Sequence, residues 1–213
     1  MNIEVEKTHV GREELRERIL TVAMEMFYKS GIKPVRMDDI ANNLSISKRT
    51  LYEVFQDKET LLLECLVRGR ELQNSYMNEV DIQKSNVLEI VLKFYQYNIA
   101  RLRRINPRFF EDLKKYPQVM NFLRNERNRD FHVVVNYFEK GIEQGIFRKD
   151  VNMDLFIRLL NLTFDNTMES DVSKNYSVNE IYSVVVITYL RGISTDKGLK
   201  ILDEFMNSIR NDN

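Results

Sequence analysis

The chain has 213 residues, of which 43% are hydrophobic and 30% charged, with only 7 glycines and 3 prolines. This composition supports a hydrophobic core and leaves little material for turns, so it predicts long helices in one or two domains. Lys plus Arg and Asp plus Glu number 32 each. The resulting zero formal charge argues against a protein that coats nucleic acid regardless of sequence, but it is compatible with a locally basic, specific binder.

Three further features predict a cytoplasmic protein with no membrane partner. The longest apolar-leaning run, residues 181–190, is shorter than the roughly 18 residues that a membrane-spanning helix needs. Residues 1–10 contain no apolar signal segment. The single cysteine, Cys65, has no internal disulfide partner. We expect it to be a small apolar residue in a helix rather than a redox sensor, since no basic cluster marks a lowered thiol pKa.

The first predicted helix covers residues from about 11 to 30. Its apolar residues recur at every fourth position: Leu15, Ile19, Ala23 and Phe27. Gly31 follows, where glycine commonly ends a helix. We expect residues 1–10 to be a flexible lead-in.

Residues 36–56 predict two short helices joined by a tight turn. Ile40, Ala41 and Leu44 share the apolar face of the first, and Ser47 is a suitable N-cap for the second. The second helix turns Leu51 inward and leaves mainly cationic and polar side chains outside: Lys48, Arg49, Thr50, Tyr52 and Glu53. Such a face is what a DNA-reading helix-turn-helix requires, although a basic cluster considered alone is more often a solvated surface.

The segments ILTVAMEMFYKSGIKPVRMDDIANNL and SISKRTLYEVFQDKETLL resemble the TetR family of one-component transcriptional regulators. The resemblance covers about the first third of the chain and depends on the whole ordered set of positions. It implies an all-α fold of about nine or ten helices. A helix-turn-helix DNA-binding domain would occupy residues 1–56, and a helical ligand-binding and dimerisation domain residues 57–213. The implied partners are a palindromic double-stranded DNA operator, a second copy of the chain and a small-molecule effector.

The resemblance also implies roles for individual residues of the head. Ser47, Lys48 and Arg49 would approach bases, and Arg49 would donate two hydrogen bonds to a guanine edge. The remaining DNA-binding candidates are phosphate-binding or flanking positions: Arg36, Met37, Thr50, Tyr52 and Lys58. Two residues depart from the family pattern. Ser45 stands where the turn often has glycine, which predicts slight strain, and Met37 stands where a hydroxyl often contacts DNA.

The rest of the chain predicts further helices, at about 57–79, 86–104, 108–114, 117–143, 153–169, 178–193 and 196–210. Arg127 continues an apolar stripe, and we favour a solvent-exposed position for it over a charge pointing into a cavity. The helix over residues 178–193 is apolar on both sides and must be buried on both sides. In a small domain, a partner chain best explains its second covered side.

The resemblance places an effector cavity among the middle helices. Aromatic and polar residues there are the ligand-binding candidates: Phe94, Tyr95, Asn98, Phe110, Phe131 and Phe164. The dimer candidates are apolar residues of the two large late helices: Phe156, Leu160, Tyr182, Val185, Val186 and Tyr189. For each ligand candidate alone, ordinary core packing is an alternative.

We expect a dimeric repressor released by a largely apolar ligand, with no cofactor, metal site or catalytic residue. One alternative is the same fold without small-molecule sensing, in which the second domain serves only for dimerisation or protein docking. An all-helical enzyme is disfavoured because the sequence has no His or Cys pair at metal spacing, no phosphate-binding loop and no nucleophile elbow.

Overall fold

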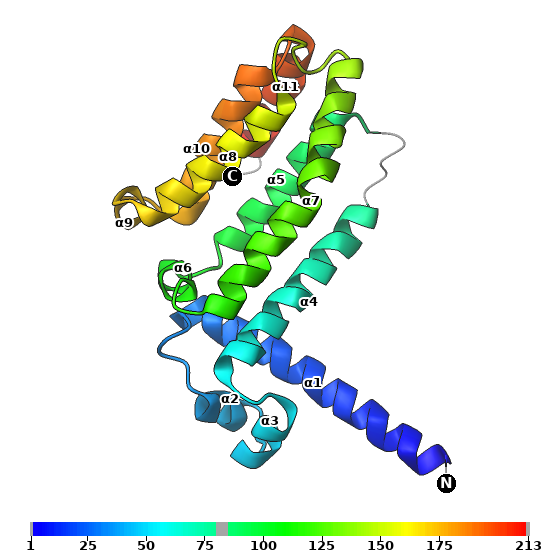
Figure 1. The fold of residues 1–213 in the computed structure, drawn as a ribbon, viewed down its shortest axis with the longest axis vertical. Helices are drawn as coiled ribbons and strands as arrows, with labels where there is room; N and C mark the ends of the chain where they lie inside the picture. The colour runs from blue at the N-terminus through cyan, green and yellow to red at the C-terminus, as the bar shows by residue number, and fades with distance from the viewer. Residues whose placement is uncertain (1, 80–84, 212–213) are drawn as a thin grey trace. The chain divides into compact units, whose positions relative to one another are not determined.

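A computed structural model describes residues 2–79 and 85–211 (Figure 1). Those residues form eleven helices and no strand, with one isolated bridge between Phe147 and Ser194. The predicted all-α class is confirmed, and the helix beyond the expected nine or ten is the one-turn α9 (Val172–Asn175). Within the described ranges, none of the helices combines the length and apolarity needed to cross a membrane.

The helices divide into two compact units. Unit 1 comprises Met1–Ser75 and Arg104–Asn125, and unit 2 comprises Tyr76–Arg103 and Glu126–Asn213. Two long helices, α4 (Lys58–Glu79) and α7 (Pro117–Glu143), contribute residues to both units. These compact units are not the predicted domains, whose boundary after residue 56 is a division by function and stays a prediction.

Unit 1 contains α1 (Asn2–Ser30), α2 (Met37–Asn43), α3 (Lys48–Val54), α6 (Pro107–Leu113) and parts of α4 and α7. Its core joins α1, the two short helices, α4 and α6 through fully buried side chains, including Phe27, Ile40, Leu51, Phe55 and Leu61. Burial raises the pKa of the Cys65 thiol in this core to about 12. That pKa suits the interpretation of Cys65 as an inert packing residue.

The expectation of a flexible lead-in at residues 1–10 was wrong, because α1 begins at Asn2. This stretch contains Glu4, Glu6 and Lys7, which are good helix formers, and no proline. Gly11 costs about 1 kcal/mol relative to alanine inside a helix, which is too little to end a long one. The other end of α1 agrees with the prediction: Gly31 follows Ser30 with φ of 85°.

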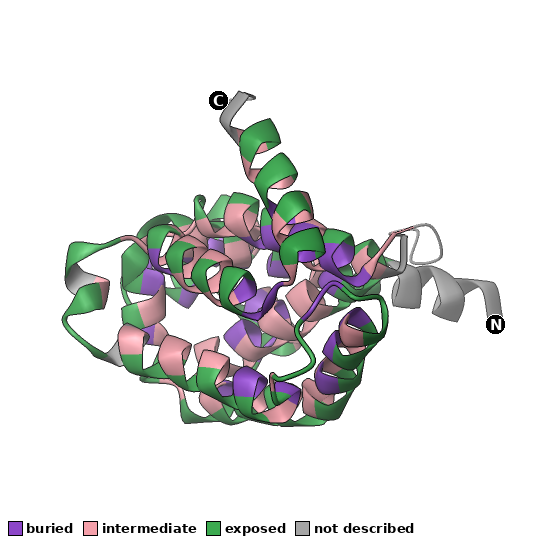
Figure 2. Ribbon diagram, turned by 90° about the horizontal axis from the view of Figure 1, so that it is seen from above, coloured by how far each residue is buried: buried purple, intermediate pink, exposed green. Residues whose placement is uncertain are grey.

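Unit 2 contains α5 (Val87–Leu102), α8 (Met153–Glu169), α9, α10 (Val178–Ile193), α11 (Asp196–Asn211) and the rest of α7. Side-chain caps define several helix starts, since the oxygens of Asn86, Asn152 and Ser177 accept hydrogen bonds from amides in the first turns of α5, α8 and α10. The core is formed by α5, α7, α8, α10 and α11. Figure 2 shows buried and exposed residues on different sides of most helices.

The turn between α2 and α3 contains a strained residue. Ser45 has φ of 54°, the only positive φ of a non-glycine residue in the described part of the chain. A side chain in this left-handed conformation crowds its own backbone, which glycine avoids. The strain predicted from the sequence is therefore present in the structure.

We predict that Ser45→Gly stabilises the protein against unfolding by about 1 kcal/mol, because it removes left-handed strain at an exposed position. Ser45→Ala is the matched control, since it removes the hydroxyl but keeps the Cβ that causes the strain. Denaturant unfolding followed by circular dichroism measures both. Equal effects of the two variants would show that the hydroxyl, and not the backbone, determines stability here.

Candidate nucleic-acid interface

The exposed face of α3 carries most of the predicted DNA-binding residues. Ser47 caps the helix, its Oγ accepting from the Thr50 amide at 3.0 Å and lying 2.7 Å from the Thr50 Oγ1. Leu51 is buried, which turns the opposite side of α3 to solvent. Exposed there are Ser47, Lys48, Arg49 and Tyr52, with Thr50 half-buried.

Both cations of this face are paired with carboxylates of the same unit. The Lys48 Nζ lies 2.8 Å from the Asp38 Oδ1 and 5.9 Å from the centre of the Tyr52 ring. The Arg49 Nε donates to the Glu53 Oε1 at 2.9 Å, one helical turn further along α3. The hydrogen bonds to Asp38 and Glu53 raise the pKa of Lys48 and of Arg49 above their ordinary values. The face therefore presents two fully charged, pre-positioned donors.

Two predicted DNA-binding residues do not belong to this exposed face. Met37 is buried at 6% exposure and packs in the core of unit 1, which corrects its assignment. The Lys58 Nζ donates to the carbonyl oxygens of Ile32 and Val35, each at 2.9 Å. Burial lowers the pKa of this ammonium group. Lys58 thus ties the start of α4 to the loop before α2, and a phosphate contact would have to compete with these bonds.

The same loop is held from its other side by α6. Asp112 is 6% exposed, and its carboxylate accepts from the Lys33 amide at 2.7 Å and from the Lys115 Nζ at 2.9 Å. Burial acts to raise the pKa of Asp112, but hydrogen bonds from the Lys33 amide, the Lys115 ammonium and the Ile32 amide outweigh it, so the pKa is lowered. Asp112 and Lys58 together fix the loop that leads into α2 (Arg36, at the start of that helix, is exposed).

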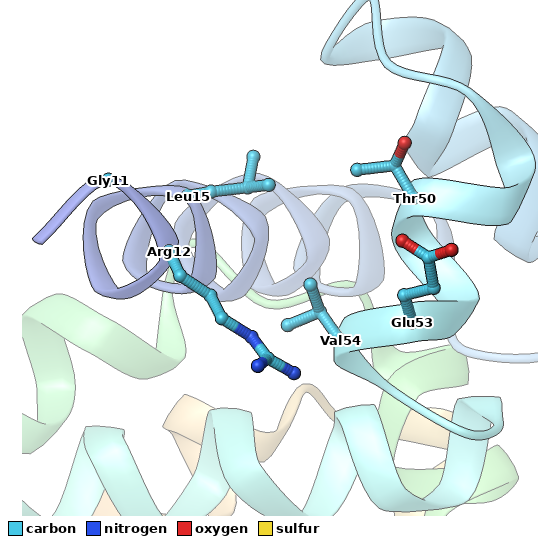
Figure 3. A pocket seen from close by; sticks show the side chains of 6 residues that line it. All are labelled: Gly11, Arg12, Leu15, Thr50, Glu53 and Val54. Atoms are coloured by element: carbon cyan, nitrogen blue, oxygen red, sulfur yellow. The ribbon is translucent and has the colours of Figure 1, made fainter. Parts of the chain in front are cut away.

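An open cleft of about 570 Å³ lies between α1 and α3. Figure 3 shows Thr50, Glu53 and Val54 of α3 on one side and Arg12 and Leu15 of α1 on the other. The cleft thus adjoins the cationic face through Thr50 and Glu53.

Five of the six ligand candidates lie in unit 2, where an aromatic and polar cluster contains three of them. Tyr182 stacks on Tyr95 and Phe164, with ring centres 5.8 and 5.5 Å apart. The Tyr95 hydroxyl lies 2.7 Å from the Ser183 Oγ. Burial raises the pKa of Tyr182 to about 12, and Asn98, which is itself buried, hydrogen-bonds to this tyrosine.

The other three ligand candidates have different surroundings. Phe94 is a half-buried residue of α5, and its carbonyl oxygen accepts a hydrogen bond from the Asn98 Nδ2 at 3.0 Å. Phe110 belongs to unit 1, where it packs edge-on against Phe109, so it is not part of the unit 2 cluster and its ligand-binding role stays a prediction. The face of Phe131 is covered by the Arg158 guanidinium, 4.3 Å from the ring centre. Arg127 pairs with Asp165 at 2.6 Å and is exposed, as favoured from the sequence.

The dimer candidates point mainly into unit 2 instead of outward. Phe156 is 8% exposed and packs with Phe138 and Tyr189, while Val186 packs against the same core. The Tyr189 hydroxyl forms a hydrogen bond with the Thr163 Oγ1 at 2.7 Å, and Leu160 and Val185 are half-buried. The exposed apolar residues of these helices are their neighbours: Leu155, Leu159 and Leu162 on α8 and Val184 on α10. On α8 the exposed Leu155 and Leu159 each precede a predicted dimer candidate by one residue, and the interface role of those candidates stays a prediction.

Residues 19–65 match the family model of bacterial regulatory proteins, tetR family. Relatives include the HTH-type transcriptional repressor KstR2 of Mycolicibacterium smegmatis, 25% identical over 154 residues, covering 70% of this chain and 75% of the relative. Another is the HTH-type transcriptional regulator UidR of Escherichia coli, 24% identical over 157 residues, covering 70% of this chain and 78% of the relative. The match over residues 19–65 and these relatives confirm the predicted resemblance to the TetR family.

Solved structures of TetR-like fold extend this similarity to most of the chain. A transcriptional regulator from Saccharomonospora viridis, solved in complex with choline, has a TM-score of 0.68 and 20% identity, covering 86% of this chain and 99% of the other. A TetR-family regulator from Marinobacter aquaeolei has a TM-score of 0.69 and 20% identity, covering 89% of this chain and 98% of the other. At this identity, the likeness establishes the fold.

Asp112 contacts the loop that leads into α2, and the sequence did not indicate this role. It follows the head by more than fifty positions and stands in a short helix with no distinctive pattern. The signal was faint: a carboxylate on the apolar side of a seven-residue helix needs a buried donor. Glu53 was recognised as outward-facing, but its hydrogen bond to Arg49 was not.

We predict that Asp112→Asn lowers the free energy of unfolding at pH 7 by about 1–3 kcal/mol, because charge-assisted hydrogen bonds to the Lys33 amide and the Lys115 ammonium are weakened. Since folding depresses this pKa, the contribution is fully present above the ordinary value of 3.8 and is lost as pH falls through the lower folded value. Unfolding curves of both proteins should therefore converge at acidic pH.

Asp165→Asn is the control for this substitution, because Asp165 forms an exposed ion pair with Arg127. Such surface ion pairs contribute about 0–1 kcal/mol to the free energy of unfolding. An Asp112→Asn effect no larger than that of the control would contradict a stabilising role for the loop contact.

Proposed function

We propose that this TetR-family protein is a sequence-specific DNA-binding transcriptional repressor that acts as a homodimer and is released from DNA by a small molecule. The observation that carries the proposal is the exposed face of α3, where Ser47, Lys48, Arg49 and Tyr52 stand together on a capped helix. Hydroxyls and cations there suit phosphate and base-edge contacts in the major groove. The repressor names of similar proteins support the direction of regulation.

A dimer follows from the size of the reading surface. One seven-residue helix contacts too few base pairs to select a site, whereas two heads related by a two-fold axis read two half-sites of a palindrome. Leu155, Leu159 and Leu162 share one side of α8 at helical spacing and are 47–54% exposed. Val184 on the neighbouring α10 is 65% exposed. An exposed apolar surface on two packed helices supports an interface between two copies.

Effector binding is proposed for the cluster around Tyr182 in unit 2. Tyr95, Asn98 and Phe164 surround this ring with apolar surface and a few hydrogen-bonding groups, the combination found in small-molecule sites. The choline complex of a protein with the same fold supports small-molecule binding in such a domain. If the effector favours a conformation that binds DNA poorly, then effector and DNA weaken each other's binding by the same factor.

Selection of sites from random duplex DNA tests the DNA-binding proposal. We expect a palindrome, with Arg49→Ala relaxing selection at one position in each half by roughly 1–3 kcal/mol, because a bidentate base contact is lost. Tyr52→Phe should weaken all sites alike, because a phosphate contact carries no sequence information. Addition of a small-molecule extract of cells should release the selected DNA.

Absence of any enriched site, with or without that extract, would contradict the proposed function. Enrichment that no extract reverses would instead favour the same fold without small-molecule sensing. Uniform weakening by Arg49→Ala would show that Arg49 contacts phosphate instead of a base.

Leu159→Lys and Val184→Lys should each convert the dimer to monomer, because a two-fold interface brings a buried lysine into it from each copy. Sedimentation velocity at micromolar concentration measures the change, and circular dichroism verifies that the helices remain. Leu72→Lys is the matched control, since Leu72 is an exposed leucine on α4, outside the proposed surface. Dimers that persist in both variants would place the interface elsewhere.

A further inference from the structure

We propose that Glu53 is a specificity-determining residue that positions Arg49 for recognition of a guanine. This inference rests on the proposed DNA-binding function and assigns a role within it. Arg49 reads the base, whereas Glu53 acts through Arg49 and has no contact with DNA of its own.

The geometry of the pair leaves the base-reading end of Arg49 available. The Arg49 Nε donates to the Glu53 Oε1 at 2.9 Å, and the structure gives Arg49 no other hydrogen bond among the residues it describes. A guanidinium group has one hydrogen on Nε and four on its two Nη atoms. Binding through Nε therefore leaves both Nη atoms, which form the fork that matches the O6 and N7 acceptors of guanine.

The pair also reduces the conformational freedom that DNA binding would otherwise remove. The Arg49 side chain is 88% exposed, so apolar packing does little to orient it. Arginine has many rotamers, and ordering a long side chain at an interface opposes binding. A carboxylate one turn away on the same helix holds the guanidinium before DNA arrives. Lys48, which pairs with Asp38, differs because an ammonium group is a point charge without a fork.

The surroundings of Glu53 indicate that it is not needed for folding. Its side chain is 60% exposed and borders the open cleft between α1 and α3 seen in Figure 3. A surface pair of this spacing contributes little to helix stability. Replacing Glu53 therefore changes Arg49 and leaves the core of the head intact.

The experiment measures discrimination at the base pair where Arg49→Ala relaxes selection. Affinities for the selected operator and for the same operator with that guanine replaced are compared for wild type, Glu53→Ala, Glu53→Gln, Arg49→Ala and the Glu53→Ala/Arg49→Ala double variant. Wild type should discriminate by about tenfold or more, as a bidentate contact does. For Glu53→Ala, the ratio of the two affinities should be at most about one third of the wild-type ratio, since the two Nη atoms of Arg49 are no longer oriented.

Two comparisons separate positioning from a general charge effect. Glu53→Gln should retain most of the discrimination, because its amide oxygen still accepts from Nε although the charge is gone. Glu53→Ala should cause no further loss in the Arg49→Ala background, because the two residues act as one unit. Glu71→Ala, which removes an exposed carboxylate of α4, should discriminate like wild type.

If wild type selects a site and Glu53→Ala discriminates at the guanine position as well as wild type does, this proposal is overturned but the proposed function is not. An equal loss in Glu53→Gln, or an added loss in the double variant, would have the same consequence. A wild-type protein that selects no site would overturn the proposed function, and this inference with it.

Discussion

The short length of α3 is the constraint on which the DNA-binding head depends. Isolated helices of fewer than about 12–15 residues are marginal in water, and α3 has seven. It exists because Leu51 and Phe55 are buried against neighbouring helices and because Ser47 satisfies an amide of its first turn. The same contacts determine which side of α3 faces outward. Packing therefore stabilises the helix and also determines that its cationic side chains face solvent.

The loop between α1 and α2 extends this dependence beyond the contiguous head. Lys58 supplies a cation to the loop carbonyls, and Asp112 supplies an anion to its amides. The two charged groups thus bond opposite ends of the Ile32–Lys33 peptide group, a polar interaction that apolar packing cannot supply. Gly31 allows this approach, since a Cβ there would lie 3.0 Å from the Cβ of Arg108 on α6. The head is consequently completed by a helix that is distant in the sequence.

Most helix boundaries were predictable because local chemistry determines them. Asn86, Ser177 and Asp57 belong to the residue types that favour N-caps, and the side chain of each accepts a hydrogen bond from a first-turn amide in the structure. The register of α8 was not predictable in the same way. Its sequence, MDLFIRLLNLTF, is apolar on several sides, so periodicity alone does not identify the side that faces the core. Phe156 and Leu159 are chemically similar, and only tertiary packing buries one and exposes the other.

The exposed residues of the candidate DNA site could be predicted from the sequence, but most of the hydrogen bonds and ion pairs that they form could not. The helical spacing of apolar and polar residues predicts that Lys48 and Arg49 are exposed on α3, and the position of Ser47 just before that helix predicts its role as the N-cap. The partners of those cations are not predicted in this way, because a surface lysine has several carboxylates within reach and the sequence does not rank them. Lys58 illustrates the limit, since its position at the start of α4 suggested a phosphate contact, whereas its ammonium group binds backbone carbonyls.

Charge balance in the head bears on how such a protein selects its site. Residues 36–58 contain four basic and four acidic side chains. Non-specific affinity for DNA comes almost entirely from cations that neutralise phosphates, so a neutral head gains little of it. Base contacts and the pairing of two heads must then supply a larger share of the binding free energy. Low background affinity favours selectivity, because a genome offers far more non-specific sites than operators. On this argument, carboxylates such as Asp38 and Glu53 contribute to recognition by limiting what the cations beside them can bind.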